Sequence, residues 1–115
     1  MPKRRCMSTQ IYHSSTFTRL CDKAKNLYTL FLLNTDDWGF VETPEFCMAL
    51  AKATNKELNE LLNSGLVLKV DEALVIVHFY NHNKNLYKSK RDETFFSSAL
   101  EKLTMNKDKE YIIKG

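Results

Sequence analysis

The most regular pattern of apolar and polar positions lies between residues 43 and 65, where it predicts two short helices joined by a tight corner. The first helix begins at Thr43 and Pro44, because threonine is a common N-cap and proline fits the first helical position, where its missing N–H is not needed. The apolar side of this helix is expected to consist of Phe46, Met48, Ala49 and Leu50.

The second helix begins at Thr54, and Glu57 follows at the spacing of a capping box, in which the two side chains satisfy backbone N–H groups of the first turn. Leu58, Leu61 and Leu62 are spaced to face inward, and Gly65 can end the helix with a positive φ. Two helices joined in this way form a helix-turn-helix unit, a shape that commonly docks in a groove of DNA.

The segments around this unit predict the rest of an α+β fold. A helix is expected over residues 22–34, and a short strand over 38–41. Two strand-like runs, 66–70 and 73–80, surround an Asp-Glu turn and predict a β-hairpin. The order helix, strand, helix, helix, hairpin is that of a winged helix-turn-helix fold with a short three-stranded antiparallel sheet, here followed by an extra C-terminal helix.

We assign residues 1–115 to a single winged-helix domain, since a chain of this length buries one core. Its parts differ in amino-acid composition along the chain. They are a basic arm or edge strand over 1–12, the helix-turn-helix unit over 43–65, the wing hairpin over 66–80, an extended basic segment over 81–91, a C-terminal helix over 92–105 and a last strand over 111–113.

Composition excludes several classes of protein. An apolar fraction of 43% is too high for a disordered chain, and no apolar run approaches the roughly 18 residues of a membrane span. The first ten residues lack the apolar stretch of a secretion signal, so we expect a cytoplasmic protein. The three cysteines form no CxxC pair, and neither a disulfide framework nor a thiolate zinc site is indicated.

Charge is distributed unevenly around a formal net charge of +3. Residues 1–25 hold six cations against one acid, and residues 84–91 hold four cations and no acid. Residues 36–72 between them hold eight acids against three lysines. Basic flanks around an acidic middle suggest that the flanks contact a polyanion.

Four stretches in this order resemble the N-terminal winged-helix domain of phage replisome organizer proteins, relatives of DnaD-type replication initiators. They read RRCMS, LYTLFLLNTDDWGFVETP, LLNSGLVLKVDEALVIVHFYNHN and KSKRDET, and the match runs from about residue 4 to 103. The resemblance implies a module that binds double-stranded DNA, for example at a phage origin. Family members usually carry a second, C-terminal domain, so contact with a replicative helicase or its loader would involve regions outside these residues.

Binding to DNA requires cations near phosphates and polar side chains that reach base edges. The candidate phosphate contacts come from the two basic segments: Lys3, Arg4, Arg5, Lys84, Lys88, Lys90 and Arg91. The candidate base or polar contacts are Asn55, Lys56, Asn59, Lys69, Asn81, Asn83 and Tyr87. Glu57, Glu60 and the Asp-Glu turn oppose DNA contact nearby, because a carboxylate repels phosphates.

Other uses of these residues stay open. The 81–91 segment fits a solvated basic loop as well, and the amides of the second helix fit a purely structural role. His78 and His82 lack a third ligand at a suitable spacing, and no nucleophilic or glycine-rich phosphate site is evident, so we expect neither metal, cofactor nor enzymatic activity. The main alternative function is a winged-helix module for protein interaction, through self-association as a homo-oligomer or as a small phage factor that binds a host protein.

Overall fold

The computed structural model describes residues 8–83 and 96–114, and within them the chain forms an α+β fold with seven helices and two small antiparallel sheets. The elements follow one another as α1 (Thr9–Tyr12), α2 (Ser15–Thr18), α3 (Asp22–Leu33), α4 (Pro44–Ala51), α5 (Asn55–Ser64), β1 (Val67–Val70), β2 (Ala73–Ile76), α6 (Phe79–His82), α7 (Ser97–Glu101), β3 (Leu103–Met105) and β4 (Tyr111–Ile113).

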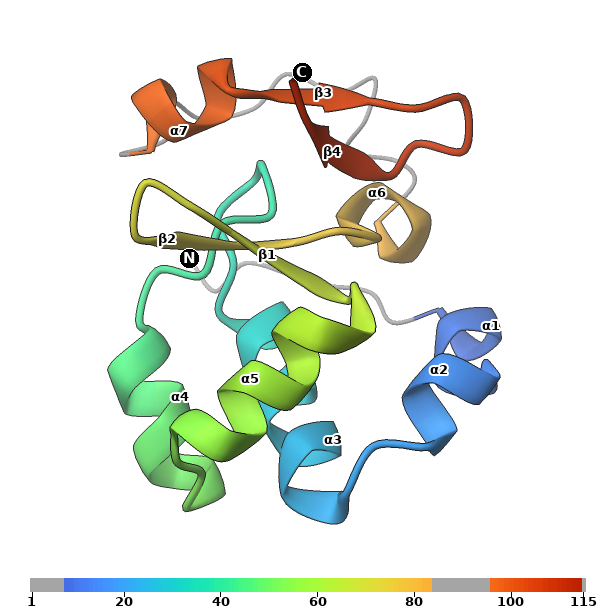
Figure 1. Ribbon diagram of the computed structural model, residues 1–115, viewed down its shortest axis with the longest axis vertical. Helices are drawn as coiled ribbons and strands as arrows, with labels where there is room; N and C mark the ends of the chain where they lie inside the picture. The colour runs from blue at the N-terminus through green and yellow to red at the C-terminus, as the bar shows by residue number, and fades with distance from the viewer. Residues whose placement is uncertain (1–7, 84–95, 115) are drawn as a thin grey trace.

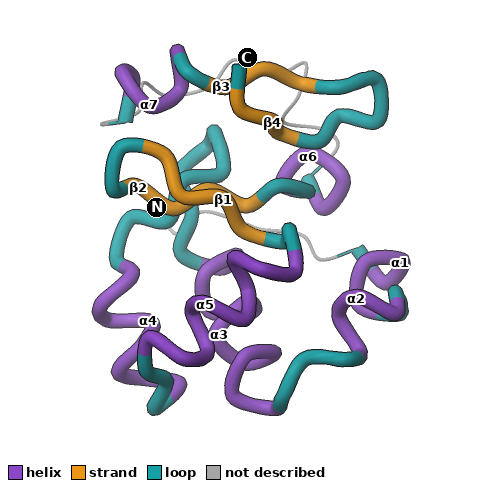
Figure 2. Tube along the Cα trace, viewed as in Figure 1, coloured by secondary structure: helices purple, strands orange, loops and turns teal. Residues whose placement is uncertain are grey.

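The elements are stacked in three layers (Figures 1 and 2). Helices α3, α4 and α5 form the lower layer, the β1–β2 hairpin forms the middle layer, and α7 with the β3–β4 hairpin forms the upper layer. The main core lies between the first two layers and contains Leu27, Phe31, Leu61, Val67 and Ile76, all fully buried. Burying an apolar side chain of this size contributes roughly 1.5 to 3 kcal/mol to stability.

Helix α5 forms as its sequence predicts. The capping box between Thr54 and Glu57 is present, with Thr54 N–H donating to Glu57 Oε1 at 2.8 Å. The helix ends at Gly65, whose φ of 81° lies in the left-handed region that glycine adopts without strain. Leu61 is fully buried against the core, and Leu58 and Leu62 pack at its margin, which confirms the inward side of this helix.

Helix α4 forms over the expected residues, but its predicted apolar side is wrong for Phe46, Ala49 and Leu50, whereas Met48 packs against the core. All eight of its residues are described, and of these Cys47 alone is buried, with Sγ 3.5 Å from the carbonyl oxygen of Leu30 on α3. Phe46 and Leu50 are 56% and 55% exposed, and the Thr43 side chain makes no capping hydrogen bond. The cause is the packing of α4 in the tertiary structure. The helix contacts α3 on the side that carries Cys47, and Phe46 and Leu50 remain exposed.

The middle layer is a two-stranded hairpin, where three strands were expected. Strands β1 and β2 pair antiparallel from Val67 with Ile76 to Val70 with Ala73. The expected third strand is reduced to two isolated bridges, Val41 with Thr35 and Phe40 with Val75 on β2, next to a hydrogen bond from Val41 N–H to the Leu74 carbonyl at 2.9 Å. Gly39 turns the chain there with a φ of 92°, so the extended segment is too short to form a strand.

The ends of the described chain also differ from expectation. Residues 9–12, expected in an arm or edge strand, form the helical turn α1, and the hairpin ends at Ile76, because residues 79–82 form α6. The C-terminal helix expected to reach residue 105 ends at Glu101, since Leu103–Met105 pair with β4 instead. The last strand, expected at residues 111–113, is confirmed as β4.

Candidate nucleic-acid interface

The two acidic side chains of α5 both accept hydrogen bonds from backbone N–H groups. Glu57 is buried and held in the capping box by Thr54. Glu60 accepts a hydrogen bond from the backbone N–H of Cys21 at 2.8 Å, at the N-terminus of α3. A carboxylate at a helix N-terminus is favourable because it accepts a hydrogen bond from a free N–H and because its negative charge is attracted to the positive end of the helix dipole. Both acids that were expected to repel DNA therefore have structural roles.

The outward side of α5 is polar and basic. Asn55, Lys56 and Asn59 are exposed, as the sequence-based assignment of base contacts requires. The pKa of Glu57 is lowered, first by the Thr54 N–H bond and further by the nearby charges of Lys23 and Lys56. Lys23 on α3 is exposed, and its charge acts on Glu57 of α5, although no sequence pattern groups it with that helix.

A groove of about 420 Å³ separates α4 and α5 from the β1–β2 hairpin, and three of the candidate residues line it. Asn55 and Asn59 border it from α5, and Lys69 borders it from β1. Glu45 and Glu72 line the same groove, and Glu72 pairs with Lys69 at 3.3 Å. The structure thus brings Asn55, Asn59 and Lys69 together, but the charge of Lys69 is offset locally.

The turn between β1 and β2, expected as the tip of a wing, is held against the upper layer. Asp71 Oδ1 lies 2.7 Å from Lys102 Nζ, which follows α7. Both turn residues have positive φ values, 51° for Asp71 and 66° for Glu72, as in a tight two-residue hairpin turn. All four residues of β2 are buried beneath the upper layer and above the helices, so this hairpin does not project from the body as a free wing.

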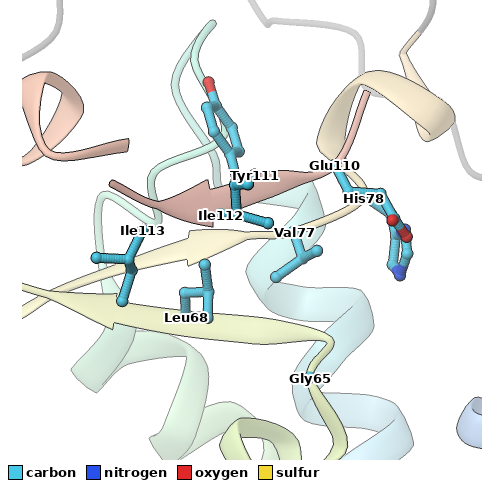
Figure 3. A pocket seen from close by; sticks show the side chains of 8 residues that line it. All are labelled: Gly65, Leu68, Val77, His78, Glu110, Tyr111, Ile112 and Ile113. Carbon is cyan, nitrogen blue, oxygen red and sulfur yellow. The ribbon is translucent and has the colours of Figure 1, made fainter. Parts of the chain in front are cut away.

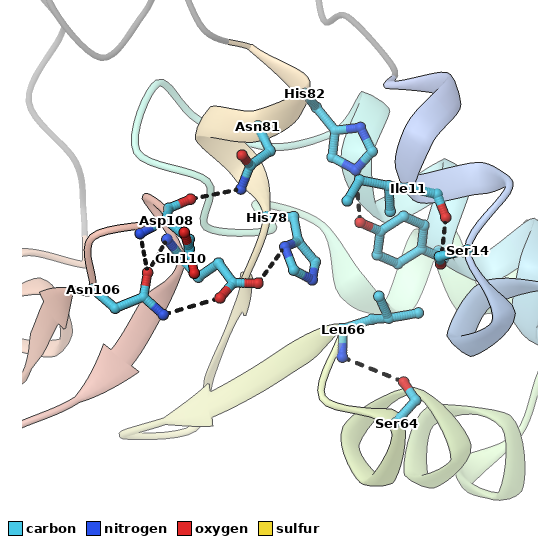
Figure 4. A network of polar contacts seen from close by, with 11 residues as sticks. Ile11, Ser14, Ser64, Leu66, His78, Asn81, His82, Asn106, Asp108 and Glu110 are labelled. Carbon is cyan, nitrogen blue, oxygen red and sulfur yellow. Dashed lines mark hydrogen bonds and ion pairs between the residues drawn. The ribbon is translucent and has the colours of Figure 1, made fainter.

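The two described asparagines of the 81–91 segment serve the fold. Asn83 is buried, and its side-chain nitrogen donates to the carbonyl oxygen of Phe79 at 3.3 Å. Asn81 donates to the carbonyl oxygen of Asp108 at 3.3 Å and joins α6 to the β3–β4 turn (Figure 4). The burial of Asn83 disfavours a contact with a base, whereas Asn81 is partly exposed, and its role as a polar contact stays a prediction.

His82 connects the two ends of the described segment 8–83. Its Nδ1 accepts from the backbone N–H of Ser8 at 2.7 Å, although the residues are 74 positions apart in sequence. The proton of the neutral ring is then on Nε2, which lies 2.8 Å from the hydroxyl of Tyr28 and can donate to it. Burial, with a smaller effect of His78, lowers the pKa of His82 to about 4, so the ring is neutral at pH 7.

The bond between Ser8 and His82 also brings together the residue that follows the first basic segment and a residue that precedes the cations of the second. Ser8 directly follows the residues that contain Lys3, Arg4 and Arg5, and His82 lies two positions before Lys84. The hydrogen bond fixes the points at which both segments leave the described body next to each other. The side chains of Lys3, Arg4, Arg5, Lys84, Tyr87, Lys88, Lys90 and Arg91 themselves lie outside the described residues.

His78 takes part in a separate polar network at the β3–β4 turn. Its Nδ1 lies 3.0 Å from Glu110 Oε2, and Asn106 donates to the other carboxylate oxygen at 2.9 Å (Figure 4). Burial lowers the pKa of His78, and the charge of Glu110 opposes that shift. His78 and Glu110 lie at one end of a groove of about 370 Å³, where Leu68 and Val77 face Ile112 and Ile113 (Figure 3).

Within residues 8–83 and 96–114, no three histidine, cysteine or acidic side chains gather as a possible metal site. In the same part of the chain, no helix combines the length and the apolar character that crossing a bilayer requires. No family model, curated protein or solved structure matches the chain.

Proposed function

We propose that this chain is a winged-helix module that binds double-stranded DNA, in the manner of a phage replication initiator or replisome organizer. In this proposal α4 and α5 are the helix-turn-helix unit, and α5 is the helix that approaches the bases. Any contact with a helicase or its loader would be made by regions outside this chain.

The observation that carries the proposal is the division of polar residues on α5. Glu57 and Glu60 form internal hydrogen bonds, whereas Asn55, Lys56 and Asn59 are exposed. Asparagine can bond adenine through two hydrogen bonds, and lysine can bond a phosphate or a guanine. Glu57 remains negatively charged, but the nearby charges of Lys23 and Lys56 partly offset it, which reduces the repulsion between this helix and a polyanion.

A second observation supports a contribution from the flanks. The hydrogen bond from Ser8 to His82 brings together two residues that adjoin the cation-rich segments, although they are 74 positions apart in the sequence. Cations that act together on one phosphate backbone release several counterions, which makes the affinity steeply dependent on salt. The covered hairpin, with its paired Asp71 and Glu72, is not part of the proposed contact surface.

Duplex binding measured by fluorescence anisotropy between about 50 and 200 mM salt tests the proposal. Changing Lys84, Lys88, Lys90 and Arg91 together to alanine should weaken binding and flatten the salt dependence, by up to about 0.9 in the logarithmic slope for each phosphate that is no longer neutralised. Lys56→Ala should reduce that slope by about 1, and Asn55→Ala with Asn59→Ala should reduce discrimination between duplex sequences by roughly 1 to 3 kcal/mol per base contact.

The matched control is Lys107→Ala, which removes an exposed cation from the β3–β4 turn. It changes the net charge by the same amount as Lys56→Ala and should leave affinity and salt slope near those of the parent. Equal losses for Lys56→Ala and Lys107→Ala would indicate nonspecific charge attraction. Unchanged binding in the fourfold variant would remove residues 84–91 from the interface.

One observation favours a second function, the use of the same domain for protein interaction. Helix α4 exposes Phe46 and Leu50, which are large apolar residues on the surface of the described chain. Capture of host proteins from an extract treated with nuclease separates the two functions. A DNA-binding protein loses its associated proteins under this treatment, whereas a protein-binding module retains them.

A further inference from the structure

Helix α5 has two flanks with different neighbours. Four residues at helical spacing line the groove of about 420 Å³ that faces α4 and the β1–β2 hairpin: Asn55, Leu58, Asn59 and Leu62. The other flank faces the start of α3, because Glu60 accepts the hydrogen bond from Cys21 N–H at 2.8 Å. In Figure 1 the hairpin lies above α5 and the start of α3 lies below it. A duplex that contacts the outward side of α5 therefore meets one of two different surfaces beside the helix.

The hairpin flank carries carboxylates. Glu45 and Glu72 line its groove, and Lys69, which lines it as well, pairs with Glu72 at 3.3 Å. Asp71, next to Glu72 in the hairpin turn, adds a further carboxylate that pairs with Lys102 at 2.7 Å. A phosphate backbone that followed this flank would approach Glu45 and Glu72 and would be repelled by them.

The α3 flank presents cations to solvent. Lys23 in the first turn of α3 and Lys56 in the first turn of α5 are both exposed. They lie around one carboxylate, since the charges of both lysines contribute to lowering the pKa of Glu57. Arg19, which ends α2, is also exposed and lies two positions before Cys21, a span of at most about 7 Å. Three helices thus contribute one exposed cation each to this side of α5.

The acids of the α3 flank are less accessible than its cations. Glu57 is buried and Glu60 is partly buried, and each accepts a hydrogen bond from a backbone N–H. Asp22 is the exposed acid in the first turn of α3. Lysine and arginine extend their charged ends into water, whereas a carboxylate bonded to the backbone stays close to it. A phosphate that approaches from solvent therefore meets three exposed cations and one exposed acid.

We propose that the phosphate backbone of a bound duplex follows the α3 flank of α5, in contact with Arg19, Lys23 and Lys56, and not the hairpin flank. This inference rests on the proposed function, because it names the side of α5 along which the duplex lies. The bond between Cys21 and Glu60 fixes the first turn of α3 against α5, so cations from separate helices keep constant positions. Cations held in this way can neutralise neighbouring phosphates and set the orientation of the protein on the duplex.

Single alanine variants of the full chain, measured by fluorescence anisotropy between about 50 and 200 mM salt, test the inference. Lys23→Ala should weaken duplex binding roughly three- to tenfold at about 100 mM salt and lower the logarithmic salt slope by about 0.9, as for one lost phosphate contact. Arg19→Ala should act in the same direction. Lys107→Ala, exposed in the β3–β4 turn, changes the net charge equally and should leave both quantities near those of the parent.

Lys69→Ala reports on the opposite flank and should weaken binding less than Lys23→Ala does. A larger loss for Lys69→Ala would overturn the inference. So would an unchanged affinity and salt slope for Lys23→Ala while Lys56→Ala is impaired, and the proposed function would then stand without the assigned flank. A parent that does not bind duplex DNA would overturn the proposed function and this inference together.

Cross-linking locates the duplex independently of affinity. In a background with Cys6→Ser and Cys21→Ser, Asp22→Cys and Glu45→Cys each place one exposed thiol in the first turn of a helix and remove one acid, on the α3 flank and the hairpin flank respectively. Cys47 is buried and keeps its thiol from the reagent. With an azidophenacyl group on the new thiol, illumination should join position 22 to the duplex in much higher yield than position 45. Equal yields, or a higher yield at position 45, would contradict the assigned flank.

Discussion

Helices α5 and α6 each bury a polar side chain beside their apolar ones, Glu57 and His82, whereas α4, directly before α5 in the chain, exposes large apolar side chains. Glu57 and Glu60 of α5 bond to backbone N–H groups, and His82 of α6 lies between Ser8 and Tyr28. On α4, Cys47 alone is buried, and Phe46 and Leu50 face outward. The two regions thus depart from the usual relation between polarity and exposure in different ways, one at a buried acid and a buried imidazole and the other at two exposed apolar side chains.

Polarity therefore does not by itself assign a residue to the core or to the surface. A buried acid or imidazole is tolerated where each polar atom has a partner, since an unsatisfied polar group costs about 1 to 3 kcal/mol. No buried polar side-chain atom lacks a hydrogen bond in the described part of the chain.

The largest expected effect compares a buried leucine of α5 with an exposed phenylalanine of α4. Leu61→Ala on α5 removes a fully buried side chain and should lower the free energy of unfolding by about 2 to 5 kcal/mol. Phe46→Ala on α4 removes a larger side chain but should cost less than about 1 kcal/mol in the monomer, because Phe46 is mostly in solvent. Urea unfolding at low protein concentration measures both, and similar losses would refute the orientation of α4.

The inward polar groups of α6 should make stability depend on pH. The pKa of His82 is about 4 in the folded chain and about 6.5 when unfolded, so the unfolded state binds the proton first as the pH falls. The contribution of His82 is complete well above pH 6.5, and about 3 kcal/mol is lost by the time the pH reaches 4.

Unfolding by urea at successive pH values measures this dependence. His82→Gln retains an acceptor for the Ser8 N–H without a titrating ring, so its stability should fall less steeply between pH 6.5 and 4. Phe46→Ala, in a helix that contains no histidine, should keep the slope of the parent. The same slope in His82→Gln as in the parent would place the acid sensitivity elsewhere.

The smallest effect compares two threonines at corresponding positions. Thr54 caps α5 through its side chain, whereas Thr43 before α4 makes no such bond. Thr54→Ala should cost about 1 kcal/mol, within a range of roughly 0.5 to 2, and Thr43→Ala should cost a few tenths. Thermal unfolding followed by circular dichroism measures the difference, and equal costs would show that α4 and α5 begin in the same way.

The sequence predicted most of the local structure and less of the candidate site. Helices α3 and α5, the hairpin turn at Asp71 and Glu72, and strand β4 follow from periodicity and turn residues. The capping-box spacing already indicated that Glu57 is engaged, but nothing near Glu60 indicated its bond to Cys21, 39 positions away. The C-terminal helix was predicted too long because pairing of β3 with β4 outweighed a helical pattern.

By itself, the sequence determined the features that depend on residues within about four positions of each other, such as the capping box at Thr54 and the left-handed end at Gly65. Only the tertiary structure decided which side of α4 meets α3, and that His82 bonds Ser8. Those outcomes depend on partners brought close by folding of the whole chain. A helical pattern specifies spacing along one element, and it does not specify which neighbour that element contacts.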